Sequence, residues 1–205
     1  MWSVGINITS ALLLQTPRSE GGYGFSNNAV GYIYFTPVVA ITLGEIFGHF
    51  FNDWLADRFV KKHAGVFKPE GRLPACYFGA VFMIPGLVLV GQALEKHLVW
   101  PAIMMGWGIF VFGVMVASVA VTAYLLDCYP SGSGEVGGFI NLARTLSGFT
   151  VGYYQQPWGL KEGFDVSFGT QAALVAAGTV VLTVIYVFGE KLRAKGGPLK
   201  FKGSA

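Results

Sequence analysis

The sequence predicts an all-α fold, a polytopic membrane helix bundle with about six transmembrane helices, the first of them truncated. Of its 205 residues, 53% are hydrophobic and only 12% are charged, and the mean hydropathy is +0.55. Soluble domains carry about 25% charged residues, so a water-facing surface is not expected. The apolar residues also form runs long enough for a helix to span a membrane, separated by short polar segments. The 29 glycines suit membrane helices, which use small residues to approach one another closely.

The N-terminal part contains one short and one full apolar run. Residues 2–15 are apolar but too few to cross the hydrocarbon core, so we interpret them as part of a spanning helix whose beginning is missing. Residues 18–28 are rich in Gly, Ser and Asn and predict a loop. Residues 29–54 form a full span, interrupted in pattern only by Pro37, Glu45 and His49.

The remaining spans follow a basic stretch. Residues 73–94 and 98–126 predict the third and fourth helices, the fourth long enough to tilt. Residues 136–155 predict a fifth helix, residues 156–167 a polar connection and residues 168–189 a sixth helix. In this organisation residues 1–189 are one transmembrane helix bundle, with a cytoplasmic loop at about residues 57–72, and residues 190–205 are a basic cytoplasmic tail.

Charge asymmetry predicts the orientation of the bundle. Loops rich in Lys and Arg stay on the cytoplasmic side of a membrane. One side would hold Arg58, Lys61, Lys62, Lys68, Arg72, Lys191, Arg193, Lys195, Lys200 and Lys202, and the other only Arg18, Lys96 and Lys161. We therefore expect an integral, multi-pass membrane protein of the plasma membrane with its C-terminus in the cytoplasm.

Residues of the basic stretch carry a resemblance to a known family. Residues 55–58, Leu-Ala-Asp-Arg, followed by two lysines at residues 61–62, resemble the loop signature of the major facilitator superfamily, Gly-x-Leu-Ala-Asp-Arg-x-Gly-Arg-Arg. The match is partial, because Asp53 stands where the leading Gly belongs and Val60 replaces the second Gly.

Further motifs resemble one branch of that superfamily, the fungal-type drug:proton antiporter-like members. They are residues 48–53 (Gly-x-x-x-Asn-Asp), 69–73 (Pro-Glu-x-Arg-Leu) and 124–130 (Tyr-x-x-Asp-x-Tyr-Pro), followed by Gly134, Glu135, Asn141 and Arg144. Family members have two six-helix halves, and this sequence looks like the second, C-terminal half. The resemblance implies transport of a small organic solute, amphipathic or cationic, coupled to protons.

Glu45 is the acidic residue that the prediction places deepest in the membrane. It lies about 18 Å of helix from Asp57, near the middle of its span. A charge at that depth costs about 2.5–3.5 kcal/mol, so it requires protonation, a partner or a wet cavity. We expect a proton-coupling or solute-contacting carboxylate; a buried acid that only bonds across helices is the alternative. His49 follows one turn later on the same face and could relay a proton or simply pack.

Arg144 is the one cation within the predicted apolar spans. It lies about 13.5 Å beyond Glu135 and requires a partner at that depth. We expect Glu45, His49, Asn141 and Arg144 to line a solute and proton cavity, in which Arg144 and Glu45 pair. The alternative is that Arg144 bonds backbone carbonyls or Asn141 and closes the cytoplasmic side.

A second set of charged residues lies at the predicted cytoplasmic ends of the helices. The resemblance implies that the loop acids and bases hold one access state of a transporter and separate in the other. The alternative is a solvated cluster of little energetic value. The predicted gating and loop-motif residues are Asp53, Asp57, Arg58, Asp127 and Glu135.

The predicted function is therefore that of a proton-coupled secondary transporter, of which this chain is a truncated C-terminal half, inactive alone. The partners expected are membrane lipid, a small organic solute and protons, and an N-terminal transporter half or a second copy. The alternative is a non-transporting helical scaffold or regulatory partner. No catalytic arrangement, zinc-ligand spacing or nucleic-acid motif is present, so we expect no enzyme, cofactor, metal or nucleic acid.

Overall fold

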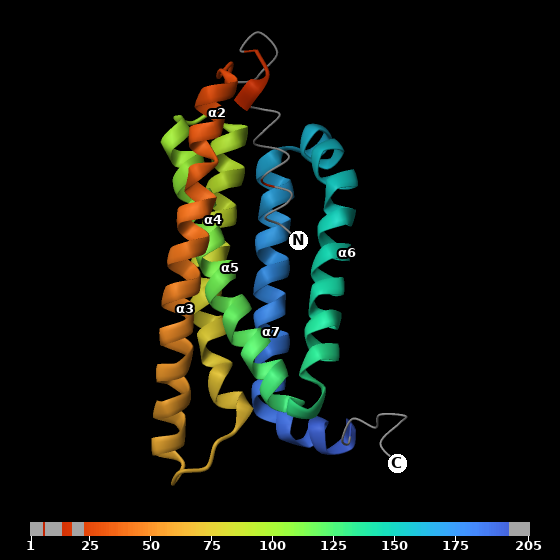
Figure 1. Ribbon diagram of the computed structural model, residues 1–205. Coiled ribbons are helices and arrows are strands. Elements are labelled where there is room, and N and C mark those ends of the chain that lie inside the picture. The colour runs from red at the N-terminus through yellow and green to blue at the C-terminus, as the bar shows by residue number, and fades with distance from the viewer. Residues whose placement is uncertain (1–5, 7–13, 18–22, 197–205) are drawn as a thin grey trace.

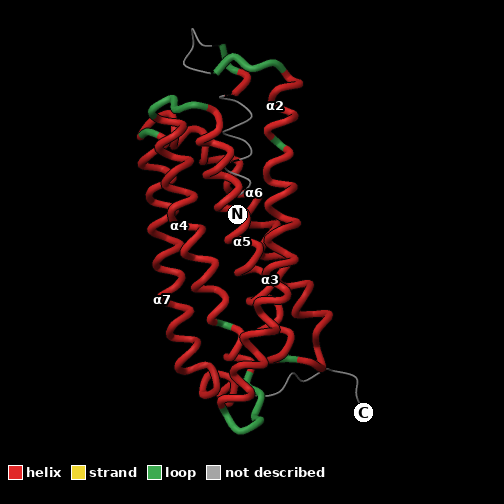
Figure 2. Tube along the Cα trace, turned by 90° about the vertical axis from the view of Figure 1, so that its left-hand side faces the viewer, coloured by secondary structure: helices red, strands yellow, loops and turns green. Residues whose placement is uncertain are grey.

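The computed structural model describes residues 6, 14–17 and 23–196, and all regular structure in these residues is helical. The elements are α2 (Asn27–Ile33), α3 (Phe35–Lys62), η2 (Pro69–Arg72), α4 (Pro74–Glu95), α5 (Trp100–Cys128), η3 (Pro130–Gly132), α6 (Ser133–Glu162) and α7 (Phe164–Gly196). The long helices run along one axis as an elongated bundle (Figures 1 and 2). Helices α3 and α6 lie on opposite sides of it, with α5 and α7 between them (Figure 1). The all-α prediction is confirmed for the described residues.

The predicted second span corresponds to α2 and α3. Ser26 caps α2, its hydroxyl accepting a hydrogen bond from the N–H of Ala29 over 3.4 Å. The two helices are separated only at Tyr34, because Pro37 has no N–H to donate to the carbonyl one turn earlier. The helix then continues to Lys62, beyond the predicted end at residue 54.

This extension corrects the predicted cytoplasmic loop at about residues 57–72. Asp57 and Arg58 belong to α3, and the connection begins at His63. Lys61 and Lys62 lie in the last turn, where the helix dipole favours cations, so the basic residues extend the helix instead of ending it.

Helices α4 and α5 confirm the predicted third and fourth spans to within two residues at each end. Glycines allow their backbones to touch: a Cβ on Gly79 would lie 2.7 Å from the Gly113 carbonyl oxygen. Further along the same pair, beside Gly86, Leu87, Trp107 and Phe110 are almost fully buried. This pair of helices forms the centre of the bundle.

The predicted polar connection at residues 156–167 is wrong. Helix α6 runs to Glu162 and α7 starts at Phe164, leaving only Gly163, whose φ of +95° reverses the chain. Of the polar side chains in this stretch, Lys161 and Glu162 are exposed at the end of α6 and Ser167 is buried between the helices. Ser167 belongs to a cluster in which Gln155 donates to Ser167 over 3.2 Å and Gln171 donates to Gln155 over 2.5 Å.

Four helical stretches of the described chain are long and apolar enough to cross a membrane. They are Asn27–Lys62, Pro69–Glu95, Trp100–Cys128 and Phe164–Lys195. The predicted fifth span lies in α6, which is helical but is not among these four. The first predicted span, residues 2–15, lies almost entirely outside the described residues. Six spans are therefore not confirmed, but an integral membrane bundle is.

The ends of the bundle differ in charge. At one end lie the C-terminal ends of α3, α5 and α7 and the start of α4 and α6 (Figure 1). This end, which we call the basic end, carries Arg58, Lys61, Lys62, Lys68, Arg72, Lys191, Arg193 and Lys195. Lys96 and Lys161 lie at the opposite end. The predicted basic tail starts within α7, which continues to Gly196; residues 197–205 lie outside the description.

Candidate functional site

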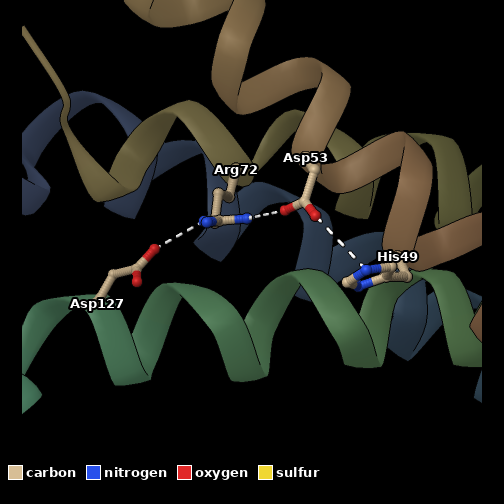
Figure 3. A network of polar contacts seen from close by, with 4 residues as sticks. All are labelled: His49, Asp53, Arg72 and Asp127. Atoms are coloured by element: carbon tan, nitrogen blue, oxygen red, sulfur yellow. Dashed lines mark hydrogen bonds and ion pairs between the residues drawn. The ribbon is translucent and has the colours of Figure 1, made fainter.

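The short turn η2 at the basic end binds three helices through charged side chains. Arg72 donates from Nε to Asp127 at the end of α5 over 2.7 Å, and from Nη1 to Asp53 of α3 over 2.9 Å (Figure 3). His49 lies one turn before Asp53, with Nε2 3.7 Å from its carboxylate. The Arg72 side chain is 18% exposed, and its planar guanidinium binds both carboxylates at once.

The same turn also binds α7. Glu70 is buried, and its Oε1 lies 2.6 Å from Nη2 of Arg193. The close approach requires Gly189, where a Cβ would lie 2.8 Å from that oxygen. Lys68 adds an ion pair with Glu190 over 2.8 Å. We call Asp53, Glu70, Arg72, Asp127 and Arg193 the charged junction.

Helix α3 carries its polar residues on one side. Glu45, His49 and Asp53 follow at intervals of four residues, so they share a face. Phe47, which stacks on Phe78 of α4 at 5.4 Å, lies about 200° away around the helix from Glu45. Glu45 and His49 therefore point away from α4. Glu45 is exposed and has no ion pair or hydrogen bond within the described part of the chain.

Arg144 of α6 lines a groove of about 480 Å³ between α5 and α6. Its Nη2 donates to the Ser118 hydroxyl and, over 3.3 Å, to the Thr122 hydroxyl, both on α5. The two hydroxyls are spaced by four residues and so face the same way. The predicted Arg144–Glu45 ion pair is absent from the structure, as is the alternative bond to Asn141, because the guanidinium is turned onto α5.

Glu45 and Arg144 nevertheless lie at similar distances from the basic end, measured along the helices. Asp53 and Asp127 bind one arginine, so they are level along the bundle. Glu45 lies about 12 Å of helix above Asp53, and Ser118, which holds Arg144, lies about 13.5 Å above Asp127. Both charges are therefore at a similar level along the bundle, on the helices flanking α5.

Of the remaining predicted residues, Glu135, Asp57 and Arg58 lie near the basic end, and Asn141 lies one turn before Arg144 in α6. Asn141, Glu135 and Asp57 are exposed, and the Arg58 guanidinium lies 5.2 Å from the Trp54 ring centre. The structure thus brings Asp53 and Asp127 together through Arg72 and leaves the other predicted gating residues outside that contact.

The sequence analysis did not identify several residues that make polar contacts at these sites. Glu70 and Arg193 are far apart in the chain, and nothing in their local pattern predicts their pairing. Ser118 and Thr122 gave a usable signal, since two hydroxyl residues one turn apart in an apolar helix mark a polar stripe. Within the described ranges no three His, Cys, Asp or Glu side chains are grouped as a metal site would require.

The sequence is similar to fungal transporters. It is 25% identical over 181 residues to the efflux pump radE of Floropilus chiversii, covering 85% of this chain and 33% of that protein. It is 28% identical over 162 residues to the MFS antiporter QDR3 of Candida albicans, covering 78% of this chain and 23% of that protein. Quinidine resistance protein 3 of Saccharomyces cerevisiae is 27% identical over 177 residues, covering 85% and 25%.

The chain thus spans between about a quarter and a third of the length of the curated relatives it matches. No protein-family model and no solved structure matches it. The relatives named here are transporters, which agrees with the prediction that the chain is not an enzyme.

Proposed function

We propose that this chain, a distant relative of the fungal drug:proton antiporter-like transporters of the major facilitator superfamily, works as the C-terminal half-bundle of a proton-coupled transporter of small organic solutes. The observation that carries the proposal is similarity to efflux pumps and antiporters along most of the described helices. Four apolar spans supply the membrane bundle. Transport would proceed by rocking of two bundles about a site near the midplane.

The proposed solute and proton cavity contains Glu45, His49, Asn141 and Arg144. Two of them, Glu45 and Arg144, are on the helices that flank α5, at a similar depth counted from the charged junction. An acid without a partner at that depth is the group in the described chain best suited to bind and release the transported proton, because protonation removes the cost of its charge.

The charged junction, with the neighbouring Asp57, Arg58 and Glu135, is proposed to control access from the basic end. It ties α3, α5 and α7 by ion pairs that are partly open to solvent, so a change in helix spacing can separate them. Contacts that exist in only one of two conformations bias their equilibrium. We place this end, with the C-terminus, in the cytoplasm.

A single half-bundle cannot seal a site from both sides. We therefore propose that the 205 residues alone do not transport, and that the site is completed by an N-terminal transporter half or by a second copy. We place the active assembly in the plasma membrane.

Vesicle uptake tests the proposal. The protein, expressed from its own locus, is studied in inside-out plasma-membrane vesicles with an acidic lumen, with quinidine as the probe because one relative is named for resistance to it. We expect proton-driven uptake that Glu45→Gln reduces about tenfold. Glu162→Gln, the same change at an exposed site at the opposite end, should leave uptake intact.

Two results would count against transport. If uptake were equal with and without the pH gradient, the transport would not be coupled to protons. A locus deletion that alters the level of another membrane protein, without any proton-driven quinidine flux, would favour the scaffold alternative.

A further inference from the structure

The groove between α5 and α6 is apolar except at one point. Its walls are formed mainly by Val114, Val121, Leu125, Phe139 and Ile140, and its polar groups are Arg144 and the serines beside it. A volume of about 480 Å³ is in the range of pockets for small organic molecules. The groove therefore suits a compact apolar body that carries one polar group.

Arg144 differs from the other described arginines in its partners. Arg72 and Arg193 each bind carboxylates, and Arg58 lies over the Trp54 ring at the basic end. Arg144 contacts only hydroxyls, and no carboxylate of the described chain lies within ion-pair distance of it. Its positive charge is thus directed into the groove without being neutralised.

Hydroxyl dipoles orient a guanidinium but do not cancel its charge. Ser118 and Thr122 take up one of its terminal nitrogens, which leaves the other N–H groups of the fork for a ligand. A carboxylate can accept a charge-assisted hydrogen bond from Nη1 or Nε, neither of which is used by the two hydroxyls, and the apolar walls of the groove strengthen the attraction. Glu45 has the right depth but lies on α3, on the other side of α5.

We propose that this groove binds an organic anion, a carboxylate on an apolar body of one or two rings, with Arg144 as its anchoring residue. The proposal rests on the proposed transport function as far as the anion is cargo, and it departs from the cationic solutes that the family resemblance implies. Ser118 and Thr122 act as positioning residues, because they hold the guanidinium without touching the ligand.

Three probes with the same ring system test the charge preference: 2-naphthoate, its isostere 2-naphthamide, and 2-naphthylmethylammonium. Binding to the detergent-purified protein, expressed from its own locus, is measured by titration calorimetry. We expect naphthoate to bind about tenfold more tightly than the amide and the ammonium probe to bind most weakly. Arg144→Gln should remove the preference and Arg144→Lys should retain part of it. Lys161→Gln, a lost cation outside the groove, should change nothing.

Thermal unfolding of each variant shows whether it is folded. A preference that survives Arg144→Gln in folded protein, tighter binding of the ammonium probe, or binding of none of the three overturns the proposal. Vesicle uptake separates this proposal from that of transport: proton-driven quinidine uptake without naphthoate binding leaves transport standing, and Arg144-dependent naphthoate binding without any flux leaves the anion site standing.

Discussion

Arg72 lies where helices α3 and α5 meet the turn η2, and its two carboxylate contacts differ in environment. The Asp127 side chain is 29% exposed and the Asp53 side chain 53% exposed. Ion pairs in contact with water are weak, so the contact with Asp127 should contribute more to stability than the contact with Asp53. The planar guanidinium reaches both acids at once, which an ammonium group cannot do with the same geometry.

Replacement of Arg72 should therefore destabilise the bundle. For Arg72→Gln we expect the free energy of unfolding to fall by about 1–3 kcal/mol, because two charge-assisted hydrogen bonds are lost. Thermal unfolding in detergent micelles, followed by tryptophan fluorescence, measures it. Arg58→Gln is the control and should cost under about 1 kcal/mol, since its contact is with an exposed ring. Equal losses in the two variants would mean that the junction has no special role.

The sequence singled out some residues that make polar contacts in the structure, but it did not predict their partners. Asp53, Asp127 and Arg144 stood out by charge and position, and all three make polar contacts. Their partners depend on how each helix is rotated about its axis, which composition and spacing do not determine. The predicted Arg144–Glu45 pair failed for this reason: depth could be counted along the helices, but direction could not.

Helices α4 and α5 are held together by backbone contact. A Cβ on Gly113 would lie 2.6 Å from the Gly79 carbonyl oxygen and 2.9 Å from Met83. Close approach of this kind lets dispersion act along the whole helix pair, which is the main attraction between helices in lipid.

A methyl group at this contact should separate the two helices. We expect Gly113→Ala to lower the free energy of unfolding by about 1–3 kcal/mol through overpacking. Gly169→Ala in α7 adds the same methyl group where no atom lies within 4 Å, and should be neutral or stabilise the helix by about 0.5–1 kcal/mol. The free energies of unfolding of the two variants are compared by thermal unfolding in detergent micelles. Opposite signs support the packing account, and a stable Gly113→Ala would contradict it.

Helix existence was predictable, but helix ends were not. Apolar runs located α3, α4, α5 and α7, because each must offer lipid an apolar surface. The error at residues 156–167 arose because the polar residues there either lie at exposed helix ends, as Lys161 and Glu162 do, or are buried, as Ser167 is in a cluster with Gln155 and Gln171. This cluster joins α6 and α7, and a reading of one segment at a time places Ser167 in a loop.

As a whole the molecule is polarised along its long axis. The basic end holds the charged junction, and the opposite end holds Lys96, directly after α4, and Lys161, in the last turn of α6. From this asymmetry the positive-inside rule predicts that the basic end faces the cytoplasm.

Thiol labelling of intact cells tests that orientation. In a Cys76→Ala, Cys128→Ser background, we expect Lys161→Cys to react with an impermeant maleimide on intact cells and Lys61→Cys only after permeabilisation, because both sites are exposed but at opposite ends. The reverse result would invert the topology. Labelling of neither site before permeabilisation would contradict the plasma-membrane location.

The most direct measurement concerns water at Arg144. In the same background, with protein expressed from its own locus, Ser147→Cys places a thiol in the groove and Val184→Cys places one on the apolar outer face of α7. If the groove is a wet solute path, an impermeant thiol reagent applied to inside-out vesicles modifies Ser147→Cys and spares Val184→Cys. If Ser147→Cys stays unmodified while Lys61→Cys reacts fully, the groove is closed to water, and the account of Arg144 as part of a transport cavity is contradicted.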